Sequence, residues 1–298
     1  MASSVNATDA TKANNSVASS FGNGEVRVGL QGNFGRVDLG AVNFNGINTT
    51  TVGMPFGTAI GGGYGSVYRV DAAASAIRDE NAVKYTTPTF SGFNATLYKS
   101  NKQTKAFNST ASSTTGIVTQ QTTFNAALGA YDKLGSQEIG LNYANGPLNV
   151  SFSNLKQDLR DVGSGTAEFT LNTLAANYAF GAAKVFGLYQ TNKNTGAAGT
   201  TTNPYVDTKY YTISGTYTIG ATTLIASAGE LKADAGAKAG EKSKIVGLGA
   251  DYALSKRTAL YARYESIDDK ASVIAAASTI DGSGTKRTRT AFGLRHNF

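Results

Sequence analysis

Few residues in this chain have the types and spacing that catalysis or metal binding requires. The sequence contains one histidine, His296, and no cysteine. A single imidazole without a second histidine, a cysteine or an acid at ligand spacing does not build a metal site. A Ser-His-Asp triad would have to use the same ring. The sequence therefore predicts no enzyme activity, no metal site and no cofactor.

Two other motifs that could do chemistry have simpler explanations. The glycine-rich stretch GGGYGS at 61–66 is not followed by the Lys-Ser/Thr pair of a phosphate-binding loop. It is therefore predicted to be a flexible loop. Paired acids at 79–80 and 268–269 each have a basic neighbour in the sequence, and we expect them to be solvated loop residues.

The composition argues against an ordinary soluble domain and against a nucleic-acid-binding protein. Only 16% of the 298 residues are charged, whereas about 25% is typical of soluble domains. The formal net charge is +7, but the basic residues are scattered singly, without the stripe and interleaved aromatics of a nucleic-acid site. The excess fits either a solvated surface or a water-filled channel lining that favours anions. No apolar run approaches the roughly 18–20 residues of a spanning helix.

The elements that position these residues alternate with a period of two. In the last ten residues, Phe292, Leu294, His296 and Phe298 share one parity, and polar or small residues occupy the other. This is the pattern of a strand with one apolar and one polar face. It recurs from residue 24 to the end and predicts about 13 strands, most in the ~9–11 residue class of membrane barrels.

The connections between these strands alternate between short and long, which places all short turns at one end of a barrel. The short connections are 34–35, 90–92, 145–147, 180–181, 219–221 and 254–256, and the long ones are 45–80, 101–137, 156–166, 194–207, 234–243 and 267–287. Aromatic residues expected to form interfacial girdles are Phe34, Phe44, Phe90, Tyr143, Tyr178, Phe180, Tyr252 and Phe298. The predicted fold is all-β, a transmembrane antiparallel β-barrel over residues 24–298, preceded by a polar segment 1–23 without a strand role. Residues 122–135 fit a short helix and a strand equally well.

Parity also predicts which side chains face lipid and which face water inside the barrel. The residues expected to face outward are Leu30, Leu97, Leu141, Val150, Tyr217, Leu248, Leu260 and Leu294. The cations expected to face inward are Arg27, Arg36, Lys84, Arg263 and Arg295. His296 falls on the lipid-facing parity, where we expect an interfacial anchor.

Several stretches resemble the general porins of Gram-negative bacteria, most closely those of β-proteobacteria. They are VGLQGNFGRVDLGAVNF at 28–44, NAVKYTTPTFSGFNATLYKS at 81–100, YANGPLNVSF at 143–152, LSKRTALYARY at 254–264 and FGLRHNF at 292–298. The resemblance implies an outer-membrane homotrimer of 16-stranded barrels. It also implies that the barrel-assembly machinery reads the terminal strand with Phe292, Leu294, His296 and Phe298. Lipid bilayer, lipopolysaccharide and small hydrophilic solutes are the other implied partners.

The chain departs from the family pattern in two places. Residue 24 aligns with the fourth strand of the family, so three strands are expected to be missing before it. Closure then requires either direct pairing of 288–298 with 24–34 or the absent segment, and the second alternative is favoured. The family also usually has an arginine where this chain has Ala41, so one cation of the pore wall is missing.

The resemblance assigns a function to the long 45–80 connection. In the family, the matching loop narrows the lumen and presents acids opposite a basic wall. The charged candidates on this connection are Arg69, Asp71, Arg78, Asp79 and Glu80, and the wall candidates are Arg27, Arg36 and Lys84. The predicted function is a diffusion channel for small hydrophilic solutes and ions with weak anion preference. The alternatives are a non-conducting barrel that acts as an adhesin and, with less support, a soluble β-rich carbohydrate binder.

Overall fold

The computed structural model describes residues 25–63, 78–101, 131–161, 165–196, 207–235, 239–268 and 286–297. This part of the chain forms one 13-stranded antiparallel sheet and one helix. The strands are β1 Val26–Gly32, β2 Gly35–Asn43, β3 Arg78–Thr86, β4 Phe93–Ser100, β5 Tyr131–Asn145, β6 Leu148–Asp161, β7 Gly165–Phe180, β8 Ala183–Gly196, β9 Thr208–Ile219, β10 Thr222–Ala233, β11 Lys242–Ala253, β12 Thr258–Asp268 and β13 Lys286–His296. The helix, α1, is Asn45–Gly53 and lies between β2 and β3 in the chain.

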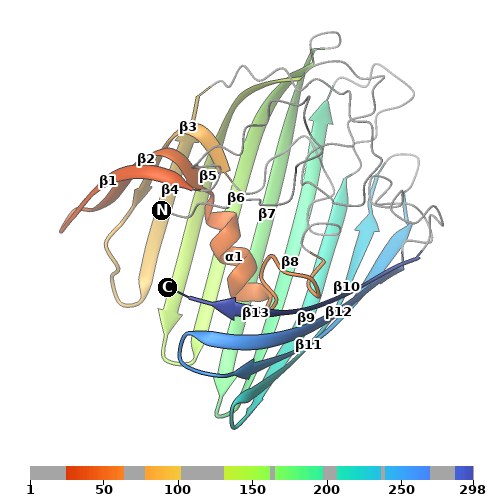
Figure 1. Cartoon of the computed structure of the whole chain (residues 1–298). Helices are drawn as coiled ribbons and strands as arrows, with labels where there is room; N and C mark the ends of the chain where they lie inside the picture. The colour runs from red at the N-terminus through yellow and green to blue at the C-terminus, as the bar shows by residue number, and fades with distance from the viewer. Residues whose placement is uncertain are drawn as a thin grey trace, which may run out of the picture.

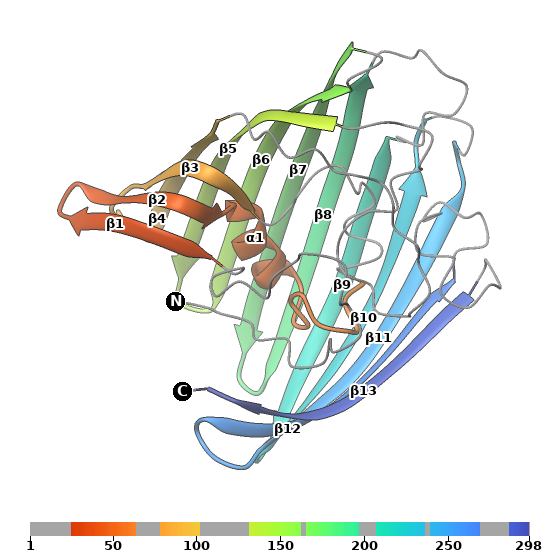
Figure 2. The same cartoon turned by 45° about the horizontal axis from the view of Figure 1, so that its top comes forward.

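The sheet curls around α1, which lies on its concave side (Figures 1 and 2). Each strand pairs with its neighbours in sequence, from β1 to β13. Within the described residues, β1 pairs only with β2 and β13 only with β12, so direct pairing of 288–298 with 24–34 is not seen. The described residues include no helix with the length and apolar character needed to cross a membrane.

The strand count agrees with the sequence prediction, but several strands are longer than expected. β5 to β8 contain 14–16 residues each. Backbone pairing continues past the apolar positions into polar pairs such as Lys156↔Thr170 and Asp158↔Glu168, where hydrophobic alternation gives no signal. Residues 131–135 of the ambiguous stretch belong to β5, and residues 122–130 lie outside the described residues.

Tight turns join the strands at the short-connection end of the sheet. β5 and β6 are joined through Gly146, and β7 and β8 through Gly181, which have φ values of 55° and 62°. Positive φ matches the twist of two-residue hairpins and costs glycine little. These turns set the registers Asn145↔Leu148 and Phe180↔Ala183.

The convex face of the sheet is apolar, as the alternation predicts. Of the residues expected to face outward, those exposed to the surroundings are Leu30, Leu97, Leu141, Tyr217, Leu248, Leu260 and Leu294. Val150 is partly exposed. An apolar face of this extent is stable in lipid but not in water.

The terminal strand presents its apolar side chains on the outer face, as predicted, whereas one predicted girdle residue does not lie there. Phe292 and Leu294 are exposed on the outer face, and the exposed His296 ring places Nδ1 2.8 Å from Thr258 Oγ1 on the neighbouring strand. Phe298 lies outside the described residues. Phe44 is not a girdle residue, because it is buried and packs on the Tyr98 ring with centroids 4.6 Å apart.

The inner face is less polar than the sequence analysis expected. A buried apolar cluster lines part of it, formed by Met54, Ala175, Leu188, Tyr210, Leu231, Ala233, Ile245 and Ile267. Ile47 and Val52 of α1 pack against this cluster. Apolar residues can occupy the inner parity here because α1 and the residues that follow it cover them.

We expect an arginine in the middle of the outer face to be much more costly than one at its border. Leu248→Arg in β11 should destabilise the folded barrel by about 2–4 kcal/mol, because the charge lies near the membrane midplane. Leu254→Arg, in the short turn after β11, should cost about 0–1 kcal/mol. Urea titration of folding into lipid vesicles measures both values. Equal costs would contradict the assignment of this face to lipid.

Candidate functional site

The first turn of helix α1 is held by a carboxylate on strand β5. The backbone N–H groups of Asn45 and Gly46 donate to the two Glu138 oxygens, at 2.5 and 2.8 Å, and Ser153 Oγ donates to the same carboxylate at 2.6 Å. The first N–H groups of a helix have no partner within it and favour negative charge. Glu138 on β5 therefore fixes where α1 begins and holds it against the inside of the sheet.

The rest of α1 is held against β6 and β7. Thr49 Oγ1 lies 2.7 Å from Ser151 Oγ, and Asn177 Nδ2 donates to the Val52 carbonyl at 2.7 Å. The second bond satisfies a carbonyl at the end of the helix that has no partner in the helix. The helix is thus held at both ends by polar groups of the barrel wall.

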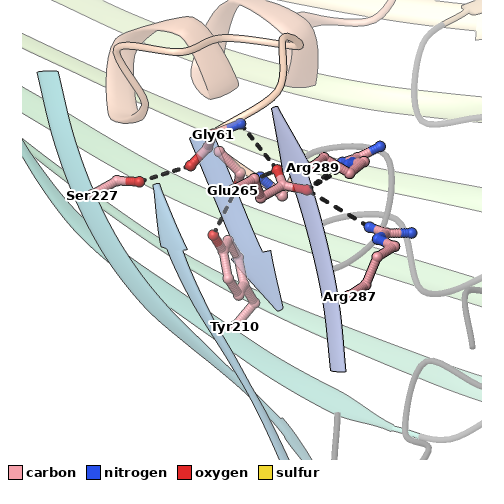
Figure 3. A network of polar contacts seen from close by, with 8 residues as sticks. Gly61, Tyr210, Ser227, Glu265, Arg287 and Arg289 are labelled. Carbon is pink, nitrogen blue, oxygen red and sulfur yellow. Dashed lines mark hydrogen bonds and ion pairs between the residues drawn. The ribbon is translucent and has the colours of Figure 1, made fainter. Parts of the chain in front are cut away.

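Residues 54–63, which we call the crossing segment, extend from α1 to the opposite wall (Figures 2 and 3). The backbone N–H groups of Gly61 and Gly63 both donate to Glu265 Oε2 on β12, at 3.0 Å each. Ser227 Oγ donates to the Gly61 carbonyl at 2.8 Å, and Tyr210 OH donates to the Gly62 carbonyl at 3.3 Å. Four hydrogen bonds from β9, β10 and β12 therefore fix the end of the segment.

Glu265 connects the crossing segment to two arginines of β13. Its side chain is 1% exposed. Its Oε1 accepts hydrogen bonds from Arg289 and lies 3.7 Å from Arg287 Nη2. A buried carboxylate is tolerated when its charge and lone pairs are satisfied in this way. Figure 3 shows the carboxylate between the segment on one side and the two guanidinium groups on the other.

A second contact to the same wall is made by the ring of Phe56. The Arg263 guanidinium carbon lies 5.6 Å from the centroid of this ring and 5.4 Å from that of Tyr261. Arg263 Nη2 also contacts Asp251 Oδ1 at 2.6 Å. The cation is therefore fixed between two aromatic rings and a carboxylate.

Two walls inside the barrel carry clusters of charged groups. The β1–β3 wall carries Arg27, Arg36 and Lys84 against Glu25, Asp38 and Asp79. Asp38 contacts Arg36 Nε at 2.9 Å and Arg27 Nη1 at 3.6 Å, and Lys84 Nζ donates to the Asn43 carbonyl at 2.9 Å. Three cations against three carboxylates leave this wall without a surplus of charge.

The β12–β13 wall carries a surplus of positive charge. Its cations are Arg263, Arg287, Arg289 and Arg295, and its carboxylates are Asp251 and Glu265. Arg295 is the most exposed cation of this set, with 58% of its side chain accessible and its Nη2 3.8 Å from Asp251. Four cations against two carboxylates leave two positive charges on this wall.

The charged residues predicted on the 45–80 connection do not all belong to one loop. Arg69 and Asp71 lie outside the described residues. Arg78, Asp79 and Glu80 were assigned to a loop, which is wrong, because they begin β3.

Asp79 also differs from a pore-facing acid. It is 3% exposed and accepts a hydrogen bond from Ser100 Oγ at 2.7 Å, so its carboxylate belongs to the wall. Arg78 Nη1 donates to Asn43 Oδ1 at 3.5 Å. The proposed part of all these residues in ion selection stays a prediction.

Sequence reasoning missed Glu138 and Arg287, and it noted Glu265 and Arg289 only as part of the polar parity of their strands. Parity alone indicated that the two acids face inward, since Glu265 alternates with Tyr264 and Glu138 with Ile139. Their roles could not be read from the sequence, because their partners lie elsewhere in the chain. Gly61 and Glu265 are 204 residues apart.

The close approach of the crossing segment to β11 predicts the effect of one added methyl group. A Cβ at Gly247 would lie 1.8 Å from the Gly61 carbonyl oxygen, so Gly247→Ala must displace the segment or distort the strand. We expect a loss of about 1–3 kcal/mol, as for other overpacked interiors, measured by denaturant unfolding in detergent. Gly187→Ala on β8 is the matched control, because its Cβ meets nothing within 4 Å. Equal stability of the two variants would contradict the contact.

An antiparallel sheet curled into a barrel, apolar outside and charged inside, is the architecture of a membrane-spanning β-barrel. A segment that crosses its interior adds the feature expected of a channel. The chain matches the model of the Gram-negative porin family over residues 4–272 and belongs to that family. It is thus an outer-membrane channel protein.

Relatives with known names support the same assignment. The chain is 32% identical to outer membrane porin protein 32 of Delftia acidovorans over 290 residues, which cover 91% of this chain and 72% of that protein. The solved anion-selective porin from Comamonas acidovorans is similar with a TM-score of 0.64 and 25% identity, covering 91% of this chain and 77% of that one. OmpT of Vibrio cholerae shares the fold with a TM-score of 0.59 and 16% identity, covering 91% and 80%.

Proposed function

We propose that this outer-membrane channel conducts small hydrophilic solutes and ions with a weak preference for anions. The observation that carries the proposal is the surplus of two cations on the β12–β13 wall. A water-filled passage lined by fixed positive charge raises the local concentration of anions and lowers that of cations. The similarity to a porin whose name describes it as anion-selective supports the same direction.

The preference is weak in this proposal because most of the cations are paired. Asp38 compensates Arg27 and Arg36, and Asp251 and Glu265 compensate the arginines of the other wall. The residue at the position of the expected additional arginine is Ala41. The crossing segment narrows the passage and places its end beside the more positive wall.

The assembly proposed with this function is a homotrimer inserted by the barrel-assembly machinery, with Phe292, Leu294, His296 and Phe298 as the terminal signal. The support is the exposed apolar face of β13 together with the family membership. Heat-dependent migration of the protein extracted from outer membranes tests the trimer. A monomer at all temperatures would contradict it.

The experiment that tests the channel is reconstitution of the full-length protein in planar lipid bilayers. Discrete conductance steps are expected, with a reversal potential in a potassium chloride gradient that indicates modest chloride preference. Swelling of protein-containing liposomes in small sugars tests passage of uncharged solutes. Absence of both conductance and swelling would favour the alternative, a non-conducting barrel that acts through its surface.

A further inference from the structure

Five asparagine side chains gather on the inner face of the sheet beside α1. Asn94, Asn142, Asn149 and Asn177 lie at inward positions of β4, β5, β6 and β7, and Asn48 belongs to the helix. We call these five residues the amide wall. Figure 2 shows α1 on the concave side of the strands that carry them.

Hydrogen bonds fix the orientation of these amides. Asn142 Oδ1 accepts from Asn48 Nδ2 at 2.8 Å, and Asn142 Nδ2 donates to Asn94 Oδ1 at 3.0 Å. Asn149 Nδ2 donates to Asn177 Oδ1 at 3.0 Å, and Asn177 Nδ2 donates to a carbonyl of α1. These bonds determine which amide atoms are occupied by the protein and which remain open to the lumen.

Two acceptors and one donor of the amide wall remain open. Each asparagine amide has a nitrogen with two donor hydrogens and an oxygen with two lone pairs. Among the residues that the structure describes, Asn48 Oδ1, Asn149 Oδ1 and Asn94 Nδ2 have no hydrogen-bond partner. Asn48 is exposed, and Asn94 and Asn149 are partly exposed. A solute inside the barrel can therefore reach all three atoms.

The charge around the amide wall favours a neutral solute. Between the short turns and α1, the inward positions that the structure describes on β4 to β7 carry no charged side chain. Lys184 borders the wall on β8, where its ammonium lies 5.0 Å from the centroid of the Phe186 ring. This ammonium repels a cationic solute. The open oxygens of Asn48 and Asn149 repel an anion, because they accept hydrogen bonds and donate none.

We propose that the amide wall is a saturable binding site for uncharged solutes with several hydroxyl groups, of the oligosaccharide class. Hydroxyl groups donate to Asn48 Oδ1 and Asn149 Oδ1, and another accepts from Asn94 Nδ2, because a hydroxyl is both donor and acceptor. Asn94 and Asn149 are two strands apart, roughly 10 Å, so several hydroxyl groups of one molecule must bind together. This inference rests on the proposed channel function, since the solute reaches the wall through the lumen.

Binding of the neutral trisaccharide raffinose to the full-length protein in detergent tests the site, with the dissociation constant measured by an NMR titration. Asn48→Ala and Asn149→Ala each remove one open acceptor, and each should raise this constant about five-fold, as expected for one hydrogen bond. The matched control is Asn154→Ala, on the same strand as Asn149 but on the outer face. There Asn154 Nδ2 donates to Asn172 Oδ1 at 2.6 Å, so the control loses a comparable cross-strand bond and should leave the constant unchanged.

A polyethylene glycol of the same mass as raffinose separates hydrogen bonding from size. Its ether oxygens accept hydrogen bonds, and only its two ends donate. In single-channel recording, raffinose should reduce the current with a saturating dependence on concentration, whereas the polyether should reduce it without saturation. Three results would overturn the proposal: an unchanged dissociation constant in both amide-wall variants, an equal loss in Asn154→Ala, or equal saturation with the polyether.

The two measurements also separate this site from the proposed function, because binding in detergent does not require a current. Raffinose binding that the amide-wall variants weaken, in a protein that never conducts, would contradict the channel proposal and leave the amide wall supported. Steady conductance with neither raffinose binding nor saturating block would contradict the amide wall and leave the channel supported.

Discussion

Glu265→Ala is expected to release the crossing segment from the β12 wall and to make the channel current unsteady. The substitution removes the acceptor of the Gly61 and Gly63 N–H groups and leaves Arg289 without its carboxylate. Breaking a buried charge pair by removing one partner costs about 3–5 kcal/mol. Single-channel recording should show several conductance levels, and thermal unfolding in detergent should occur at a lower temperature.

Glu168→Ala is the matched control, because it makes the same change at an exposed site. Glu168 and Lys156 form an ion pair of 3.5 Å, and about 40% of each side chain is exposed. The loss of folding free energy should therefore be below about 1 kcal/mol. Glu265→Gln separates the loss of the hydrogen bonds from the loss of the charge. The amide oxygen of the glutamine can still accept hydrogen bonds from the crossing segment, but it carries no charge to pair with Arg289. A steady current at a single level in Glu265→Ala would show that the other contacts suffice to hold the segment.

Replacing Arg27, Arg36 and Lys84 together by glutamine is expected to reduce the chloride-to-potassium permeability ratio several-fold. The β1–β3 wall would change from a balance of charges to three negative ones, because Glu25, Asp38 and Asp79 remain. Fixed negative charge along the passage favours potassium. The reversal potential in a potassium chloride gradient measures the change.

The control for this variant removes the same charge from the outer face. Lys232→Gln, Lys242→Gln and Lys244→Gln lie on the convex side of the sheet, where they should not alter the permeability ratio. An unchanged reversal potential in the inner triple variant would place the filter on the β12–β13 wall, which carries the surplus of cations. Equal shifts in both variants would show that only the net charge of the protein matters.

The number of strands and the outer face of the sheet can be predicted from the sequence alone. The period of two in β9 to β13 is a local property, and the lipid against which one parity packs is uniform along every strand. A residue such as Leu248 or Leu294 is therefore assigned correctly without knowledge of its neighbours. The same parity placed Arg263 and Arg295 inside, because a charge within the lipid-facing band is costly.

The helical structure of residues 45–53 could not be predicted from this alternation. The sequence NGINTTTVG contains two glycines and three threonines, which are poor helix formers. It forms α1 because Glu138 satisfies its first N–H groups and because Ser151 and Asn177 of the wall contact Thr49 and the Val52 carbonyl. Each of these conditions depends on, or is supported by, the surrounding barrel.

Which inner residues act together depends on contacts that form when the whole chain folds. Parity placed Glu265 inside, but its contact with a backbone 204 residues away exists only after the sheet has curled. The same curling allows Leu188 and Ile245 to be buried on a face predicted to be wet, since α1 and the crossing segment cover it. Alternation records the direction of a side chain relative to its own strand, whereas contacts across the interior depend on how far the sheet curls and on what fills it.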